Sequence, residues 1–303
     1  MPLVIDPGAA SPLDFAEVIA RLEERGVDLA NPDALPEYAA LLAGLSANRD
    51  FLADRVMAEL KASYGRQLGD NRYSAQVFLL HRSGRRFYLR ANLWPAARDY
   101  AYVTSGPAAF SYEVPHDHNF NFLTVGHLGP GYVSDYYEYD AESVDGRLDE
   151  PLNLTFAERS SLSGGKVMLY RAHCDIHRQL PPDSLSISLN IMEEGAAVPW
   201  RDQYIVDLER GTIAKRPTLS QGEMLLRCAV HFCAEGIDLA DQFAARHPVP
   251  RVRANAIAAL AAVANGDGRA ATLERGLNDS DARVRDDCAR WLAIIPHPGD
   301  YDP

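Results

Sequence analysis

A run of short strand-like segments between about residues 70 and 208 most constrains the fold of this 303-residue chain. Segments 75–80 and 86–90 flank Ser83-Gly84, a dipeptide typical of a hairpin turn. Further strands are expected at 109–114, 120–125, 132–139, 166–170, 185–192 and 204–208. Many short strands without helices between them indicate an all-β sandwich or barrel.

The sequence on either side of this run has a helical pattern. Apolar residues recur at helical spacing in segments 14–24, 35–45 and 50–64. Near the other end, Arg251-Val252-Arg253 recurs as Arg283-Val284-Arg285, an offset of 32 residues, which resembles a HEAT-like repeat. An ordinary helical extension is the alternative. We therefore expect a helical segment at 1–68, a β-barrel at 69–215 and a HEAT-like helical segment at 216–303.

The most informative motif is His116-Asp117-His118. Residues i and i+2 of a strand point to the same face, so both imidazoles can reach one metal ion. A third ligand must come from elsewhere, and both His173 and His177 stand shortly before the strand expected at 185–192. Three neutral imidazoles on one side of a metal leave other positions open, which suits Fe(II) and its need to bind both substrate and dioxygen.

This combination of a His-x-His pair and a later histidine beside antiparallel strands resembles the cupin pattern. Within it, His116-Asp117-His118 and the stretch from His177-Arg178 to Ser186-Ile187-Ser188-Leu189 resemble the two metal motifs of the thiol dioxygenases of the cysteine dioxygenase family. Tyr88-Leu89-Arg90 looks like the strand whose arginine grips the substrate carboxylate there. The resemblance implies a central double-stranded β-helix, Fe(II) on His116, His118 and His177, and Arg90 as carboxylate anchor. The distance from His177 to the next strand matches the family better than that from His173.

The chain departs from this family in the strand after the third ligand. The family's Ser-x-His-x-Tyr run reads Ser188-Leu189-Asn190-Ile191-Met192 here, so Asn190 stands in the place of the histidine and the tyrosine is missing. The groups that orient the substrate and oxygen therefore differ. We expect a small carboxylate-bearing substrate of amino acid or thiol type, with Asn190 beside the metal ligands.

The tyrosine-rich segment 132–139 supplies two further candidates for catalysis. Strand alternation puts Tyr136 and Glu138 on one face. If that face points inward, Tyr136 can donate a phenol proton and Glu138 can act as a general base or a fourth ligand. The alternative is an aromatic strand that packs on another layer, with Glu138 at the rim.

These features together predict an iron-dependent oxygenase that works without 2-oxoglutarate, because His118 stands where such enzymes carry an acidic ligand. The alternatives are a metal-dependent isomerase or hydrolase on the same barrel, and a ligand-binding module that recruits a peptide or protein through the helical segment. The net charge of −12 speaks against a nucleic-acid partner. No leader-like or membrane-spanning stretch is apparent, so the cytoplasm is the expected location.

Overall fold

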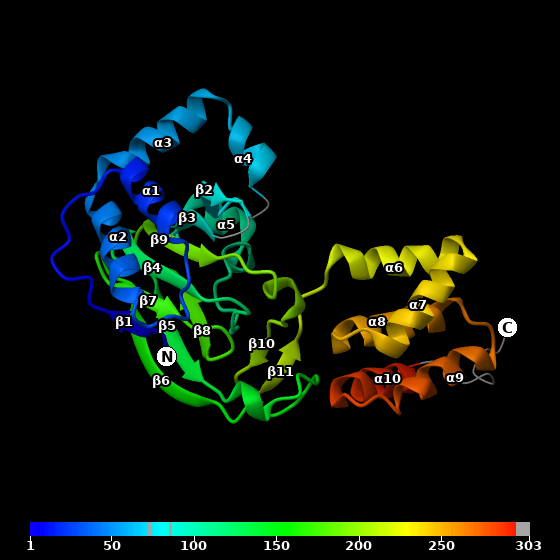
Figure 1. The fold of residues 1–303 in the computed structure, drawn as a ribbon. Helices are drawn as coiled ribbons and strands as arrows, with labels where there is room; N and C mark the ends of the chain where they lie inside the picture. The colour runs from blue at the N-terminus through cyan, green and yellow to red at the C-terminus, as the bar shows by residue number, and fades with distance from the viewer. Residues whose placement is uncertain (72–73, 85–86, 295–303) are drawn as a thin grey trace. The chain divides into compact units, whose positions relative to one another are not determined.

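The computed structural model describes residues 1–71, 74–84 and 87–294 (Figure 1). The strands of residues 1–141 and 152–211 form two antiparallel sheets. The larger sheet has the order β1 (Leu3–Ile5), β7 (Val167–Tyr170), β4 (Phe122–Leu128), β9 (Ser186–Glu193), β3 (Phe87–Trp94), β2 (Val77–Ser83). The smaller has the order β6 (Thr155–Ser161), β5 (Val133–Glu138), β8 (Asp175–Leu180), and β10 (Ile205–Asp207) lies outside both. The hairpin predicted at Ser83-Gly84 is confirmed by the pairing of β2 with β3.

Strand alternation gives the large sheet two different faces. In β9, Leu189 and Ile191 are fully buried in one hydrophobic core, together with apolar side chains of the N-terminal helices. The alternate residues of the strand, Ser188 and Asn190, point to the other face, where the Ser188 hydroxyl accepts a hydrogen bond from Trp94 Nε1 (3.0 Å). We call these the helix face and the inner face of the sheet.

Four helices lie N-terminal to β2: α1 (Phe15–Arg25), α2 (Leu35–Ala47), α3 (Asp50–Lys61) and α4 (Gly65–Asp70). The side chain of Asp14 caps α1 by accepting from the backbone N–H of Ala16 (2.7 Å). Helix α2 packs against β4 and β9, as Figure 1 shows. Helix α1 also packs against α2, so most side chains of α2 are buried. Helices α1, α2 and α3 share one core with the sheet, and α4 contacts β2, so the segment predicted at 1–68 belongs to the same unit as the strands.

Strand β2 is the last strand of the large sheet, and side chains of the α4 region bind its outer backbone edge. The side-chain amide of Gln67 donates to the carbonyl of Leu79 (2.9 Å) and accepts from the N–H of the same residue (3.0 Å). Asn71 Nδ2 donates to the carbonyl of Val77 (2.6 Å). Two side-chain amides thus take the place that a further strand would occupy.

The prediction of a strand at 109–114 is wrong. The chain there forms a 3-10 turn at Pro107–Phe110, which follows the short helix α5 (Tyr100–Ser105). Ser111 and Glu113 then take positive φ angles of 55° and 61°, which a strand does not allow. Two more 3-10 turns span Ala141–Ser143 and Val198–Trp200.

Residues 142–151 and 212–303 form a second unit, described up to residue 294. It contains β11 (Thr212–Lys215), α6 (Gln221–Phe232), α7 (Ala234–Arg246), α8 (Pro250–Val263), α9 (Asp267–Gly276) and α10 (Ala282–Ile294). Each helix packs against the next along the chain, and a core of its own lies between them. None of the helices in the described part of the chain is both long and apolar enough to cross a lipid bilayer.

The internal repeat occupies matching places in this unit, at the starts of α8 and α10. Val252 and Val284 are buried, and so are Arg251 and Arg283 one residue before them. The third residues of the motif reach the same turn between α9 and α10. There Arg253 forms two hydrogen bonds with the Asp279 carboxylate, and Arg285 donates to the carbonyl of Asp279 (2.7 Å).

Candidate metal centre

His116 and His177 are joined through their backbones. The N–H of His116 donates to the carbonyl of His177 (3.1 Å) and the N–H of His177 donates back to the carbonyl of His116 (3.0 Å). Such a directly opposed antiparallel pair puts both side chains on the same side. His118 was expected on the same strand as His116, but His116 forms isolated bridges with His177 and Ile205, and β4 begins at Phe122. The ring of His118 nevertheless lies beside those of His116 and His177.

The three imidazoles of His116, His118 and His177 converge. One ring nitrogen from each lies within 4.8 Å of the other two. The ring centroids are 4.4 Å apart for His116 and His177, and 5.0 Å apart for each of the pairs with His118. The ring of His116 is oriented by a contact of 2.7 Å between Nδ1 and the carbonyl of Val114, so its Nε2 is left as the lone-pair nitrogen.

Burial keeps the three rings neutral. It is the main cause that lowers the pKa of His116 and holds the pKa values of His118 and His177 well below the usual value for histidine. Repulsion between neighbouring imidazoles lowers the pKa values of His118 and His177 further, and the charge of Arg90 adds to this at His118. Neutral imidazole is the form that binds metal ions.

The chemistry of this donor set fits a transition-metal ion. Nδ1 of His118 and Nε2 of His177 are buried, and neither has a hydrogen-bond partner among the residues that the structure describes. A buried polar atom without a partner is costly unless another group satisfies it. A cation between the rings would satisfy such nitrogens, and three imidazoles would leave open positions on one side.

His173, the alternative third ligand, lies elsewhere. Its Nδ1 is 3.5 Å from a carboxylate oxygen of Asp117, and it is not part of the three-histidine group. Asp117 is fully buried and also accepts from the hydroxyl of Tyr139 (2.7 Å) and the N–H of Tyr204 (2.6 Å). Asp117, which stands between His116 and His118, therefore links this loop by hydrogen bonds to the segments of Tyr139 and Tyr204. The sequence gives no signal for this role beyond the position of Asp117 inside the motif.

Arg90 and Asn190 are register partners on the inner face of the large sheet. The charge of Arg90 is among the causes that lower the pKa of His118, after burial and the two other imidazoles. Asn190 is 2% exposed, and its Nδ2 has no hydrogen-bond partner within the described parts of the chain. A cation and an amide donor thus stand together beside the three rings.

Of the two candidates on β5, Tyr136 lies inside and Glu138 at the rim. Tyr136 is fully buried and is the register partner of His177. The Glu138 carboxylate, about half exposed, binds Arg171 (3.0 Å), and the structure does not group it with the three histidines. It forms a separate cluster with Cys174 and Asp175, in which Arg171 also neutralises Asp175 (2.7 Å).

Tyr170, at the end of β7, was not predicted as a residue of the site. Its ring centroid lies 4.9 Å from that of His177, and its hydroxyl lies 2.8 Å from that of Tyr136 and 3.4 Å from that of Tyr132. Burial, followed by the neighbouring phenols, raises the pKa of Tyr170 far above its usual range, so it stays a neutral phenol. Strand alternation predicts only that Tyr170 points inward, because Val167 and Leu169 belong to the helix face; it does not predict the contact with His177.

Several solved structures resemble this fold, all at low similarity. A cupin domain from Bordetella pertussis has 12% identity over 42% of this chain and 100% of that one, with a TM-score of 0.23. A DMSP lyase from Ruegeria pomeroyi has 11% identity over 64% of this chain and 78% of that one, with a TM-score of 0.25. A hydroquinone 1,2-dioxygenase has 9% identity over 43% and 71%, with a TM-score of 0.23. No family model matches the chain, and no curated protein matches it.

Proposed function

We propose that this protein is a mononuclear non-haem iron oxygenase of the cupin type, in which His116, His118 and His177 hold Fe(II). The observation that carries the proposal is the convergence of three neutral imidazoles, with ligand atoms within 4.8 Å of one another. The bound ion would supply adjacent open positions where dioxygen and substrate meet. The two facing sheets would then form the double-stranded β-helix, and α6–α10 a HEAT-like segment.

The charge of the site supports an anionic substrate. A ligand set of three imidazoles contains no carboxylate, so both charges of a divalent ion would stay uncompensated by the ligands. Arg90 adds a further positive charge close to His118. A guanidinium binds a carboxylate through two parallel hydrogen bonds, which fixes the orientation of the group. We therefore propose a small carboxylate-bearing substrate, of amino acid or thiol type, with Arg90 on its carboxylate.

The remaining inner-face residues would position the substrate and exclude water. Asn190, on the strand beside Arg90, can donate a hydrogen bond from Nδ2. Tyr170 and Tyr136 form a linked pair of neutral phenols next to His177, and either can hold or donate a proton at its hydroxyl oxygen. Phe122, whose ring stacks on that of Tyr170 at 4.4 Å, closes this side with apolar surface.

The test is metal analysis of protein purified without oxygen, followed by measurement of oxygen uptake with a panel of amino acids, thiols and small acids. We expect about one iron per chain and uptake that requires both iron and a carboxylate-bearing compound. Turnover of substrate without oxygen uptake, with zinc or manganese bound, would replace this proposal by a metal-dependent isomerase or hydrolase. Failure to bind any divalent metal would leave a ligand-binding module.

A further inference from the structure

Three polar side chains form a row across the inner face of the large sheet. Arg90 of β3 is the register partner of Asn190 of β9, and Asn190 is in turn the partner of Thr124 of β4. Thr124 points inward because Leu123 and Val125, on either side of it, belong to the core of the helix face. We call these three residues the polar row. The proposed function uses Arg90 and Asn190, and it gives no role to Thr124.

Thr124 and Asn190 each have a buried polar atom that is open to a ligand. Thr124 is 0% exposed, and its Oγ1 has no hydrogen-bond partner among the described residues. The same holds for Nδ2 of Asn190, so these two register partners do not bond to each other although they are neighbours across the strands. A buried polar atom without a partner costs free energy unless another group binds it. A hydroxyl and an amide N–H are therefore available at one place.

Two other hydroxyl groups show what is particular about Thr124. Ser188, two residues before Asn190 on the same face, accepts from Nε1 of Trp94 (3.0 Å), so its hydroxyl stabilises the fold. Thr212 of β11, in the second unit, also has a buried Oγ1 without a partner among the described residues. One such atom makes no ligand site. Thr124 differs because it belongs to the polar row, where its neighbour also has an open N–H donor.

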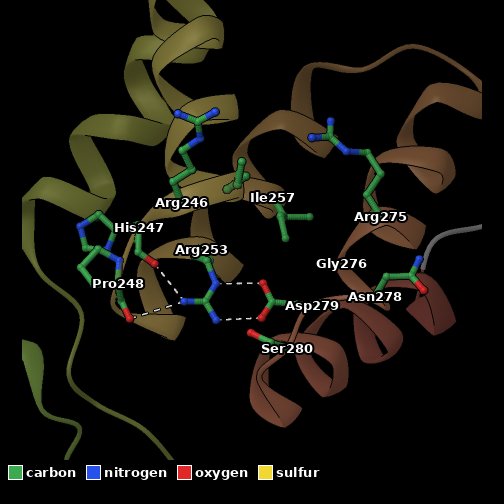
Figure 2. A pocket seen from close by; sticks show the side chains of 12 residues that line it. Arg246, His247, Pro248, Arg253, Ile257, Arg275, Gly276, Asn278, Asp279 and Ser280 are labelled. Atoms are coloured by element: carbon green, nitrogen blue, oxygen red, sulfur yellow. Dashed lines mark hydrogen bonds and ion pairs between the residues drawn. The ribbon is translucent and has the colours of Figure 1, made fainter.

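A cavity of about 500 Å³ in the second unit shows the opposite case, in which polar side chains bind one another (Figure 2). The guanidinium of Arg253 forms two bonds with the Asp279 carboxylate and donates to the carbonyl of His247 (2.9 Å). Arg275, which also lines the cavity, pairs with Asp241 (2.8 Å). Among the described side chains around this cavity, none has a buried polar atom without a partner. The polar row therefore calls for a ligand more strongly than this larger opening does.

The polar row lies next to the candidate metal centre. The ring centroid of Phe122, two residues before Thr124 on the same face, is 4.9 Å from that of His118. Residues two apart on a strand are separated by about 7 Å, and neighbouring strands by about 4.8 Å. The backbones at Thr124 and Arg90 are therefore about 10 Å apart, with Asn190 between them. A substrate with its carboxylate on Arg90 can thus reach Asn190 and Thr124 with a group a few atoms away from that carboxylate.

We infer that the substrate carries a hydroxyl group besides its carboxylate, and that Thr124 and Asn190 bind this hydroxyl together. Its oxygen would accept from Nδ2 of Asn190, and its hydrogen would be donated to Oγ1 of Thr124. A hydroxyl suits both partners because it accepts and donates at one atom. Thr124 would then determine specificity, since a site built to bind a hydroxyl discriminates against an analogue without one. The inference rests on the proposed function, in which Arg90 holds the carboxylate.

The test is calorimetric titration, without oxygen, of the full-length protein with the metal that it retains on purification. The probes are two pairs of acids that differ by one hydroxyl group: serine and alanine, and 4-hydroxybutyrate and butyrate. We expect the hydroxylated member of at least one pair to bind at least about fivefold more tightly, as one or two net hydrogen bonds provide. Thr124→Val should abolish this preference and change the affinity for the plain acid less than about twofold. Thr124→Ser, which keeps a hydroxyl, should retain the preference.

Controls separate hydroxyl recognition from carboxylate binding and from a role in folding. Thr212→Val makes the same chemical change at a buried hydroxyl of the second unit and should keep the preference. Arg90→Gln should weaken binding of both members of a pair by the same factor, because it acts on the carboxylate. Without a probe, Thr124→Val should keep or raise the midpoint of urea denaturation, since a methyl group replaces a hydroxyl that has no partner among the described residues. A lower midpoint would indicate a structural role for the hydroxyl and overturn the inference.

The possible results distinguish this inference from the proposed function. Equal affinities within both pairs overturn the inference and leave the carboxylate site intact. The same conclusion follows if the preference survives in Thr124→Val, or if Thr212→Val also abolishes it. If no member of either pair binds, the carboxylate site of the proposed function fails as well. Thr124→Ala keeps the test decisive if Thr124→Val does not fold, because it also removes the hydroxyl.

Discussion

The two faces of the large sheet are built from the same strands and have opposite characters. On the helix face, Leu189 and Ile191 of β9 are fully buried among apolar side chains of the N-terminal helices. On the inner face, Ser188 and Asn190 of the same strand are also buried, but beside Arg90 and the three imidazoles. Polar groups cost free energy when buried, so the helix face must provide stability while the inner face provides chemistry.

Because the two faces differ in this way, substitutions of neighbouring residues in one strand should affect different properties of the protein. Because successive side chains point to opposite faces, a substitution at residue 189 and one at residue 190 act in different environments only one peptide unit apart. If the comparison is correct, substitutions on the helix face change stability, and those on the inner face change metal binding or catalysis.

The largest effect is expected for His177→Ala. Removal of one of three ligands should lower the affinity for Fe(II) at least about 100-fold, since even loss of a group that only orients a ligand costs 10–100-fold. Oxygen uptake should fall in parallel. The matched control is His173→Ala, which should keep its metal because the structure places His173 next to Asp117. Metal loss in His173→Ala with retention in His177→Ala would reverse the assignment.

Leu189→Ala should unfold the protein more easily without changing the site. The side chain is 0% exposed, so truncation should lower the free energy of unfolding by about 2–5 kcal/mol. Iron content and turnover per folded molecule should stay within about twofold of the parent protein. Urea denaturation and metal analysis of the folded fraction measure the two quantities.

The neighbouring substitution Asn190→Leu is the counterpart on the inner face. It replaces an amide whose Nδ2 has no partner among the described residues by an apolar group of similar size, so the free energy of unfolding should change by less than about 1 kcal/mol. Turnover should fall instead. The comparison of the two faces fails if Leu189→Ala and Asn190→Leu lose stability and turnover in the same proportion.

Arg90→Gln should raise KM for the carboxylate-bearing substrate about 10- to 100-fold, because a hydrogen bond to a charged group contributes about 1.5–3 kcal/mol. Iron content should be unchanged. Arg159→Gln is a control on the small sheet, where Arg159 binds Asp135 (2.5 Å) away from the histidines, and it should leave KM unaltered. An equal rise in KM for a substrate analogue without the carboxylate would show that Arg90 has a different role.

The smallest effect concerns the pH dependence of stability in the metal-free protein. Burial lowers the pKa values of His118 and His177, so below about pH 6.5 the unfolded chain binds protons that the folded chain does not. Stability should therefore fall as the pH decreases from 7.5 to 5.5, by up to about 1.4 kcal/mol for each imidazole. The variant His177→Asn should show a shallower pH dependence in urea titrations, and an unchanged dependence would contradict neutral burial of this ring.

The histidines of the candidate site could be predicted from the sequence because they lie in recognisable motifs. Strand β8, which carries His177, was missed. Its polar residues gave no apolar pattern, and it is held instead by contacts that only the fold creates, such as the ion pair of Arg178 with Asp135 (2.5 Å). The strand predicted at 109–114 likewise does not form, because positive φ angles at Ser111 and Glu113 turn the chain there.

The roles of Glu138 and Tyr170 show a second limit. Alternation correctly puts Glu138 on the same face as Tyr136, but the strand ends there, and Arg171 binds the carboxylate at the rim. Tyr170 lies next to His177 because β7 and β8 meet in space. Which side chains share a site thus depends on where strands end and which sheets face each other, and neither is encoded in local periodicity.

The two side-chain amides along β2 have a consequence for the behaviour of the protein in concentrated solution. An uncovered edge strand can pair with the edge of another molecule and start a growing intermolecular sheet. Gln67 and Asn71 occupy hydrogen-bonding groups of Leu79 and Val77 that such pairing would need. We therefore expect Gln67 of α4, and Asn71 directly after this helix, to hinder the pairing of β2 with the edge of another molecule.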